Sequence, residues 1–563
     1  MEREIYEYDA IVIGSGISGG WAAKELCENG LQTLLLERGR NVEHLKDYPT
    51  TSNMPFEFAH LGQLTDAVKQ ENPIASKCYA FKEDAIHFFV KDKQHPYTQT
   101  KPFDWIRSYQ LGGKSITWGR QTQRWSDFDF EGPLRDGFAV DWPIRYKDLA
   151  SWYSYVEKFV GISGNKDGLA ELPDGEFLPP MEMTAVEQYF KNKMSVLYAD
   201  RKVIMGRCAH LTKPQPVHLE QGRGTCQTRN LCQRGCPFGG YFNSNSTTIP
   251  YAQKTGKLTL KTESVVHSIL YDEHKGKATG VRVIDTLTKE EKVYYAKVIF
   301  VNAGTLNTNL ILLNSTSNRF PNGLGNDNDI LGQYVAFHNY RGRITAEFDG
   351  MLDSYSEGRR PTSLYIPRFR NLHRQETNFL RGYAAGFKAL RMQEALKGFG
   401  EDLKSQILDR KYGNWAIQSH MMGETIPREF NRVKLNRENT DQWGVPLLDF
   451  DIQYTDNEEK MLKDYFEQIA DMFDKAGFKN IQTQDAQWNP GLDIHEMGGV
   501  RMGKDANTSL LNEWNQLHHC KNVFVTDGAC MTSTGTQNPS LTYMALTARA
   551  CHYAIGELRK NNI

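Results

Sequence analysis

The stretch of residues 8–37 reads YDAIVIGSGISGGWAAKELCENGLQTLLLE. Its apolar residues 8–13 predict a strand, residues 21–29 a helix and residues 32–36 a second strand, with glycines in the first turn. This order is that of a βαβ unit. We therefore expect an α/β fold that is built on a parallel, Rossmann-like sheet.

The three motif glycines have separate physical tasks. Gly14 makes the tight turn, Gly16 lets the backbone approach a pyrophosphate, and Gly19 lets the helix pack closely on the strand. The N-terminus of the helix offers free N–H groups to phosphates. Glu37, at the end of the second strand, is suited to hydrogen-bond a ribose diol. Together they predict dinucleotide binding; the alternative is a glycine-rich turn in an unrelated α/β domain.

Strand-forming segments near both ends of the chain bracket a long middle region. Residues 298–304 and 522–528 read as buried strands, and each is followed by a predicted helix. A nucleotide-binding domain assembled from both ends, with an α+β substrate-binding domain and insertions between them, explains this arrangement best. We assign residues 1–55, 100–140, 224–345 and 485–563 to the first, and 56–99, 141–223 and 346–484 to the second.

Composition excludes several classes of partner. The 563 residues include 67 basic and 68 acidic ones, which leaves no electrostatic footprint for nucleic acid or for an anionic membrane surface. No apolar run approaches the roughly 18–20 residues of a membrane-spanning helix. The charged N-terminus lacks the apolar core of a secretory signal. We expect no nucleic-acid partner, no membrane span and no export signal of this chain's own.

Three of the nine cysteines, Cys226, Cys232 and Cys236, fall within eleven residues and precede Pro237. Short spacings with a terminal Cys-Pro recur in iron–sulfur ligation, and the neighbouring Arg229 and Arg234 can offset cluster charge. A disulfide or unliganded thiols are the alternatives. Zinc would normally require a fourth ligand, for which Cys208 is the reserve candidate.

The motifs, taken in order, resemble those of the glucose-methanol-choline (GMC) oxidoreductase family, and in particular its bacterial sugar dehydrogenases. The most specific are the segment 494–503 around His495 and, forty-three residues after that histidine, Asn538-Pro539. The resemblance implies that the bound dinucleotide is FAD. It places the following residues at the cofactor: Gly14, Gly16, Gly19, Glu37, Gly112, Gly113, Ser115, Thr117, Val266, Ala303, Asp527, Gly528 and Pro539.

The resemblance also assigns the catalytic pair. Oxidation of an alcohol needs a base within hydrogen-bond reach of the hydroxyl while hydride leaves the carbon for flavin N5. By resemblance, His495 is that base and Asn538 orients the hydroxyl. An amide cannot share the proton, so His495 is expected to act alone, with a pKa of about 6 to 7.

The resemblance also bears on the flavin linkage, on the three cysteines and on partner subunits. Pyranose oxidases attach FAD through a histidine at the position of Thr117, so noncovalent FAD is expected here. The cysteine spacing resembles that of sugar dehydrogenases with a three-iron, four-sulfur cluster. In these enzymes the catalytic subunit has two partners. One is a small subunit that carries the export signal, and the other is a cytochrome c. The resemblance therefore implies a periplasmic site through co-export, and otherwise a cytoplasmic one.

The substrate implied by the resemblance to glucoside 3-dehydrogenases is a sugar or glycoside that is oxidised at pyranose C3. An aldonate or polyol dehydrogenase, similar to the gluconate 2-dehydrogenase large subunit, is the alternative, together with a pyranose 2-oxidase-like enzyme. An aldonate would call for an arginine clamp, which the sequence does not locate. Tyr340, Trp415 and His420 are candidates to stack on a sugar, although such residues more often belong to the core.

Overall fold

The computed structural model describes residues 7–354, 360–393, 397–408 and 412–563. One sheet has the Rossmann arrangement expected from the N-terminal stretch, with β1 (Tyr8–Ile13) at its centre. The strands around β1 are parallel, apart from the short edge strand β19. On one side lie β2 (Thr33–Leu36) and β7 (Leu258–Lys261), and on the other β10 (Glu291–Val301), β20 (Cys520–Val525) and β19 (Gln516–Leu517).

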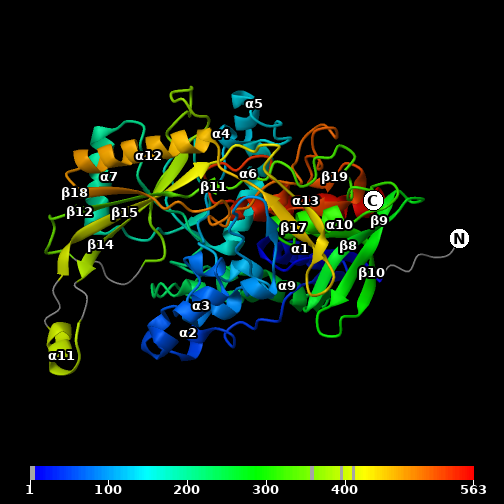
Figure 1. Ribbon diagram of the computed structural model, residues 1–563, viewed down its shortest axis with the longest axis horizontal. Coiled ribbons are helices and arrows are strands. Elements are labelled where there is room, and N and C mark those ends of the chain that lie inside the picture. Colours follow the sequence, from blue (N-terminus) through cyan, green and yellow to red (C-terminus); the bar gives the residue numbers. More distant parts are fainter. Residues whose placement is uncertain (1–6, 355–359, 394–396, 409–411) are drawn as a thin grey trace.

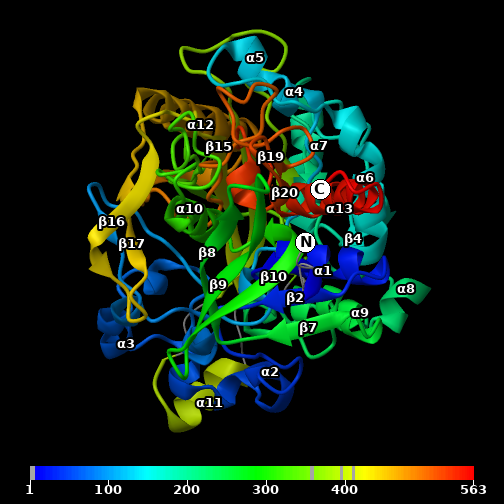
Figure 2. The ribbon, with the colours of Figure 1, turned by 90° about the vertical axis from the view of Figure 1, so that its right-hand side faces the viewer.

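Helices cover both faces of this sheet because alternate side chains of its strands are apolar on both sides. Ala10 and Val12 pack in a cluster with α1 (Ile17–Glu28) and α13 (Ser540–Arg559), whereas Ile11 belongs to the core that includes α10 (Thr305–Asn314). Figure 2 shows α1 and α13 beside the sheet, with the hairpin of β8 (Ser264–Asp272) and β9 (Lys277–Asp285) extending from β10.

A second, antiparallel sheet is formed by the middle of the chain. Its strands follow the order β18 (Lys479–Asp485), β12 (Gly342–Phe348), β15 (Tyr412–Glu424), β14 (Tyr383–Gln393), β13 (Leu364–Ile366) and β6 (Ile204–Met205), with β11 (His338–Asn339) paired to β15. Two helices, α7 (Ala185–Leu197) and α12 (Asp456–Lys475), cover one face of it (Figure 1). The α/β fold class with two parts is thus confirmed.

The division of the chain is more finely interleaved than expected. The segment assigned as 224–345 ends inside β12, because β11 and β12 belong to the second sheet. Conversely, α6 (Tyr146–Val160), assigned to the substrate-binding part, packs on α13 through Leu149, Tyr153 and Val156. Hydrophobic contact, rather than order in the chain, decides which sheet an element joins.

Smaller elements complete the structure. They are α2 (Pro49–Ser52), α3 (Asp66–Glu71), β3 (Thr98–Gln99), α4 (Asp127–Phe130), α5 (Gly132–Asp136), β4 (Ile162–Ser163), β5 (Phe177–Leu178), α8 (Pro216–Glu220), α9 (Thr248–Lys254), α11 (Gly400–Leu408), β16 (Arg432–Thr440) and β17 (Pro446–Asp451). Across the described ranges, no helix is both long enough and apolar enough to cross a bilayer.

Candidate active site

A cavity of about 450 Å³ lies where the parallel strands of the Rossmann sheet end. The residues at or directly after the carboxyl ends of β1, β2 and β10, namely Gly14, Glu37 and Asn302, line it. This edge of a parallel sheet is where dinucleotides bind in such folds. Tyr340, just before β12, and His420, in β15, also line this cavity, so the cavity joins the two parts of the protein.

The glycine-rich turn has the geometry that its sequence predicts. A Cβ on Gly19 would lie 1.8 Å from the carbonyl oxygen of Gly14, which itself has a φ of +91°. A Cβ on Gly16 would meet nothing within 4 Å, and Gly16 faces the cavity. Gly14 and Gly19 therefore shape the turn, while Gly16 leaves open space where a phosphate can approach.

Glu37 holds this turn in place. Its carboxylate accepts hydrogen bonds from the backbone N–H of Ser15 at 3.1 Å and of Gly39 at 2.9 Å, and from the Ser15 hydroxyl. Burial raises the pKa of the Glu37 carboxyl, while the Ser15 and Gly39 hydrogen bonds lower it. Glu37 lines the cavity, so the expected ribose contact remains a prediction that its position permits.

Buried polar atoms without a partner surround the cavity. In a folded protein such atoms normally find a hydrogen-bond partner, so their concentration here indicates a polar ligand. Within the described part of the chain they include side-chain atoms of Ser18, Arg38, Arg107, Ser108, Arg120, Asn302, Asp493, Glu496 and Tyr543, all of which line the cavity. These donors and acceptors fit the phosphates, ribityl chain and ring edges of FAD.

Nearly all predicted cofactor residues meet at this cavity. Gly113, Ser115, Thr117, Val266, Ala303, Asp527, Gly528 and Pro539 line it together with Gly14, Gly16 and Glu37. Gly19 and Gly112 stand behind the lining. The left-handed Gly112 (φ +87°) donates its backbone N–H to the Ser15 hydroxyl oxygen at 2.9 Å, so it ties the second glycine segment to the first.

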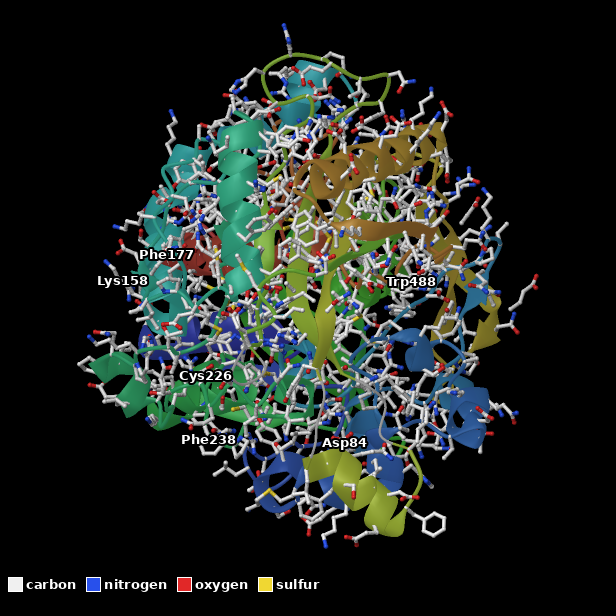
Figure 3. The ribbon with its side chains drawn as sticks, turned by 90° about the vertical axis from the view of Figure 1, so that its left-hand side faces the viewer. Asp84, Lys158, Phe177, Cys226, Phe238 and Trp488 are labelled. Atoms are coloured by element: carbon white, nitrogen blue, oxygen red, sulfur yellow. The ribbon has the colours of Figure 1, made fainter. Side chains whose placement is uncertain are left out.

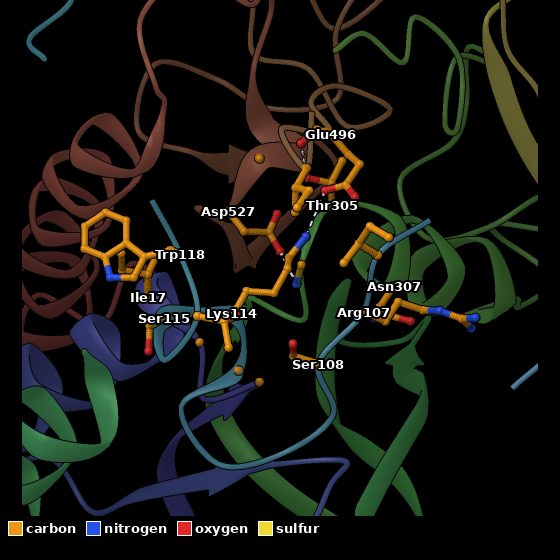
Figure 4. A pocket seen from close by; sticks show the side chains of 18 of the residues that line it. Ile17, Arg107, Ser108, Lys114, Ser115, Trp118, Thr305, Asn307, Glu496 and Asp527 are labelled. Atoms are coloured by element: carbon orange, nitrogen blue, oxygen red, sulfur yellow. Dashed lines mark hydrogen bonds and ion pairs between the residues drawn. The ribbon is translucent and has the colours of Figure 1, made fainter. Parts of the chain in front are cut away.

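Asp527 fixes a neighbouring turn at the same edge. Its carboxylate accepts from the N–H of Gly304 at 2.9 Å and from the hydroxyl of Thr308 at 2.6 Å. Burial raises its pKa to about 6, which these hydrogen bonds oppose. Figure 4 shows Asp527 beside Lys114, whose ammonium pairs with Glu496 at 3.0 Å. Lys114 and Glu496 therefore place an ion pair in the lining of the cavity.

The predicted catalytic pair is assembled at the far end of the cavity. His495 Nε2 lies 3.2 Å from the side-chain amide nitrogen of Asn538, and both residues line the cavity. On the other side of its ring, His495 Nδ1 lies 2.9 Å from Nδ1 of the buried His338. Ile494 has a φ of +65°, a strained conformation for a β-branched residue that costs about 1–3 kcal/mol. Such strain is typical of residues that aim a functional side chain.

The expected pKa of His495 is wrong for the protein as folded. Burial, with further contributions from His338 and Lys114, lowers the pKa of His495 well below 6.5. Beside His495, burial raises the pKa of the Asp493 carboxyl to about 7, which is close to neutrality. Asp493 accepts the backbone N–H of His338 at 2.8 Å and that of His495 at 3.3 Å.

This assignment predicts the pH dependence of flavin reduction. His338, Lys114, Asp493 and Glu496 are the charged or titratable groups around His495. Above about pH 7 the ionised Asp493 should stabilise the protonated form of His495. We therefore expect the anaerobic reduction rate to rise with pH through about 7 in the wild type. Asp493→Asn should remove that inflection; an inflection that persists in this variant would contradict the assignment to Asp493.

The three clustered cysteines lie beside the flavin cavity. They are free thiols, and Gln233, next to Cys232, lines the cavity. Burial raises the pKa of Cys226 to about 11 and also raises that of Cys236, while backbone N–H groups lower both. Figure 3 shows Cys226 and Phe238 on one face of the molecule. In the described chain the three sulfurs do not gather within 4.8 Å, which disfavours a single zinc ion.

The charges around the cysteines differ from those expected. Arg234 is turned away, because it pairs with Asp84. Arg229 acts on Cys236, as expected, and the buried Arg120 acts on Cys232. Arg120 also lines the cavity, so its guanidinium lies between the cavity and the cysteine segment.

The reserve ligand, Cys208, has another role. Its sulfur lies 3.1 Å from Nδ1 of His210, and Nε2 of the same ring lies 3.5 Å from the sulfur of Cys232. His210 therefore bridges the two cysteines. Cys208 contacts the cysteine segment through this ring.

A second hollow of about 320 Å³, here called the vestibule, adjoins the cavity. Gln121, Tyr340, Pro361 and His420 line both spaces, so the two are continuous. The vestibule is also lined by Asn230, Arg343, Arg360, Thr362, Ser363, Lys388, Gln418 and Ser419. Trp415, by contrast, is fully buried in the core of the second sheet and cannot stack on a substrate.

Three functional residues escape sequence reasoning. His338 lies in β11, Asp493 lies in the loop before His495, and Arg120 lies in the segment after Trp118. No short sequence motif marks any of these residues. Only the fold brings His338 to His495, 157 residues further along the chain.

A dinucleotide cavity that ends at a paired histidine and asparagine defines a cofactor-dependent alcohol oxidoreductase. Two models described as GMC oxidoreductase match residues 144–338 and 427–547, together more than half of the chain. The chain thus belongs to the GMC oxidoreductase family and is an FAD-dependent oxidoreductase of CH–OH substrates.

Relatives agree over the full length. The chain is 27% identical to the 2-methyl-1,2-propanediol dehydrogenase of Mycolicibacterium austroafricanum, over 98% of this chain and 96% of that one. It is 24% identical to the fructose dehydrogenase large subunit of Gluconobacter japonicus, over 100% of both. The structure of pyridoxine 4-oxidase from Mesorbium loti matches with a TM-score of 0.62 at 14% identity, over 97% and 98% of the two chains, which supports the fold.

Proposed function

We propose that the protein is a dehydrogenase that oxidises a secondary hydroxyl of a sugar or glycoside, preferentially at pyranose C3, to a ketone. The observation that carries the proposal is the pair of His495 Nε2 and the Asn538 amide, 3.2 Å apart at the end of the cavity. The vestibule, lined by amides, hydroxyls and cations, is continuous with the cavity that holds this pair. Such a path suits a polyhydroxylated substrate better than an apolar alcohol.

FAD, when bound, supplies the hydride acceptor. The residues of the chain supply the rest. The Asn538 amide donates to the substrate oxygen, and His495 Nε2 takes the hydroxyl proton. The hydroxyl thus gives its proton to His495, and bound FAD would accept the hydride from the same carbon, so that a C=O bond is left. Lys114 and Glu496 form an ion pair that lines the proposed flavin site.

The cysteine segment supports electron transfer to a protein acceptor. Cys226, Cys232 and Cys236 would hold a three-iron, four-sulfur cluster, and the guanidinium groups of Arg120 and Arg229 would offset the charge of the thiolates. The ring of His210, with Nε2 at 3.5 Å from the sulfur of Cys232, is within reach of a hydrogen bond to that thiolate. Gln233 and Arg120 connect this segment to the flavin cavity. A cluster beside a flavin gives electrons a route out of the site that an oxidase does not need.

Relatives support a multisubunit enzyme. One is the large subunit of fructose dehydrogenase, and another, 23% identical, is the gluconate 2-dehydrogenase flavoprotein of Pantoea cypripedii. We propose that this chain also works with a small export-signal-bearing subunit and a cytochrome c, in the periplasm. Without such a partner, a cytoplasmic location is the alternative.

A second candidate is an aldonate dehydrogenase. The vestibule contains the arginine that the sequence did not locate: the Arg343 guanidinium stacks on Tyr340 at 4.0 Å and on Trp488 at 4.5 Å. A carboxylate in the vestibule would pair with it. Arg343→Gln should then weaken reduction by gluconate while leaving reduction by a neutral glucoside unchanged.

The pyranose 2-oxidase-like alternative is tested through the flavin linkage. Thr117 lines the cavity and cannot form a histidyl bond to the flavin. We expect denaturation to release all of the FAD into the supernatant of the precipitated protein. Flavin that stays on the chain would contradict noncovalent binding and would need another attachment residue.

The regiochemistry is tested with methyl glucoside that carries deuterium at C3 only. Because hydride leaves from that carbon, the anaerobic rate of flavin reduction should fall relative to the unlabelled sugar. A glucoside labelled at C2 is the matched control and should react at the unlabelled rate. A slowing by the C2 label alone would assign the enzyme to the 2-oxidising class.

A further inference from the structure

The ring of His338 is fixed by its surroundings. His338 is fully buried in β11, and its Nε2 lies 3.0 Å from the carbonyl oxygen of Gly535 and 3.3 Å from that of Thr534. Carbonyl oxygens only accept hydrogen bonds, so the proton of the neutral ring must be on Nε2. Burial lowers the pKa of His338 to about 4, so the ring is neutral at pH 7.

A neutral ring with its proton on Nε2 has a lone pair on Nδ1. This atom lies 2.9 Å from Nδ1 of His495, at hydrogen-bond distance. One of the two nitrogens must donate, and His338 cannot. The proton of His495 is therefore on Nδ1, which leaves a lone pair on its Nε2.

We infer that His338 is a positioning residue, which selects the tautomer of His495 whose basic nitrogen, Nε2, faces the substrate hydroxyl and Asn538. In the other tautomer Nε2 would carry a proton and could not accept one. After proton transfer the ring of His495 still donates from Nδ1 to the neutral His338, which stabilises the charged form. The inference rests on the proposed function only in taking His495 as the base.

Asp493 fixes the position of His338 relative to His495. Asp493 accepts the backbone N–H of both histidines, so it clamps β11 to the loop that carries His495. Among the described residues, one group brings three atoms that could bind a metal within 4.8 Å of one another. It consists of His338, Asp493 and His495. The mutual hydrogen bond of the two Nδ1 atoms accounts for that grouping without a metal ion.

Two variants of the holoenzyme test the inference. His338→Leu removes the acceptor, whereas His338→Asn places an amide oxygen near the position of Nδ1. We expect His338→Leu to slow flavin reduction roughly 10–100-fold, as loss of an orienting partner does, and His338→Asn to recover most of that rate. The apparent substrate Kd should change much less than the rate in both.

His218→Asn is the matched control. His218 is also buried, with Nε2 3.1 Å from the Lys158 carbonyl and Nδ1 accepting the Gln215 N–H at 3.0 Å, remote from the cavity. It should reduce flavin at the wild-type rate. A wild-type rate in His338→Leu would overturn the inference, as would equal losses in His338→Leu and His338→Asn.

A spectroscopic readout separates this inference from the proposed function. In protein labelled with ¹⁵N-histidine, the signals lost in His495→Ala identify its ring nitrogens. We expect a protonated Nδ1 and an unprotonated Nε2 in the wild type, and a mixture in His338→Leu. A protonated Nε2 in the wild type would overturn the inference. Failure of every sugar to reduce the flavin would instead reject the proposed substrate and leave this readout intact.

Discussion

His495→Ala should lower the rate of flavin reduction by roughly 10²–10⁴-fold, which is the usual contribution of a positioned base. Its Nε2 lies at the end of the cavity beside Asn538, while its Nδ1 is held by His338. Asn538 has no basic nitrogen, so it cannot replace the lost base. The sugar is held by several other groups, and its apparent Kd should change far less. Anaerobic stopped-flow bleaching of the flavin measures both quantities.

The control for this variant is His274→Ala, because His274 is exposed in the turn between β8 and β9, away from the cavity. It should reduce flavin as the wild type does. FAD content must be equal in all three proteins, so that loss of cofactor is not read as loss of catalysis. A wild-type rate in His495→Ala would remove the catalytic assignment.

Cys232→Ser should abolish electron delivery to a cytochrome c while sugar-dependent flavin reduction stays within a few-fold of wild type. Cys232 is the buried member of the cluster of three, and both His210 and Arg120 act on its sulfur. Loss of a thiolate removes a ligand that the hydroxyl of serine replaces poorly. Iron and sulfide content of anaerobically prepared protein, with cytochrome c reduction, are the measurements.

Cys520→Ser provides the thiol control, because Cys520 is also buried but lies in the edge hairpin of the Rossmann sheet. It should keep iron, sulfide and cytochrome reduction. Wild-type protein without iron would end the cluster proposal. Equal cytochrome reduction in Cys232→Ser and wild type would show that electrons leave the flavin by another route.

The parallel sheet could be predicted because its signals are local. The apolar run of β1 and the glycines of the first turn depend on neighbours in the chain, and the structure confirms them. The second sheet was harder to foresee. Its strands pair across distant segments, as β6 does with β13, and α6 joins the first core through contacts with α13 that leave no short-range pattern.

The candidate site divides in the same way. Most predicted cofactor residues and both catalytic residues meet at one cavity, because motif spacing reports on local turns. The environment of these residues was not predictable. The pKa of His495 depends on burial and on His338, and the cation beside Cys232 is Arg120 rather than Arg234. Both effects arise from packing between segments that are distant in the sequence.

The most direct test of the account is one anaerobic mixing experiment. The FAD-loaded wild-type protein is mixed with methyl glucoside while the oxidised-flavin absorbance is followed, and the sugar product is then identified. We predict complete bleaching of the flavin and a sugar ketone with the carbonyl at C3. An unchanged flavin spectrum with glucosides, free sugars and aldonates alike would contradict the account, because the cavity, the His495–Asn538 pair and the vestibule would then lack the substrate for which they are proposed.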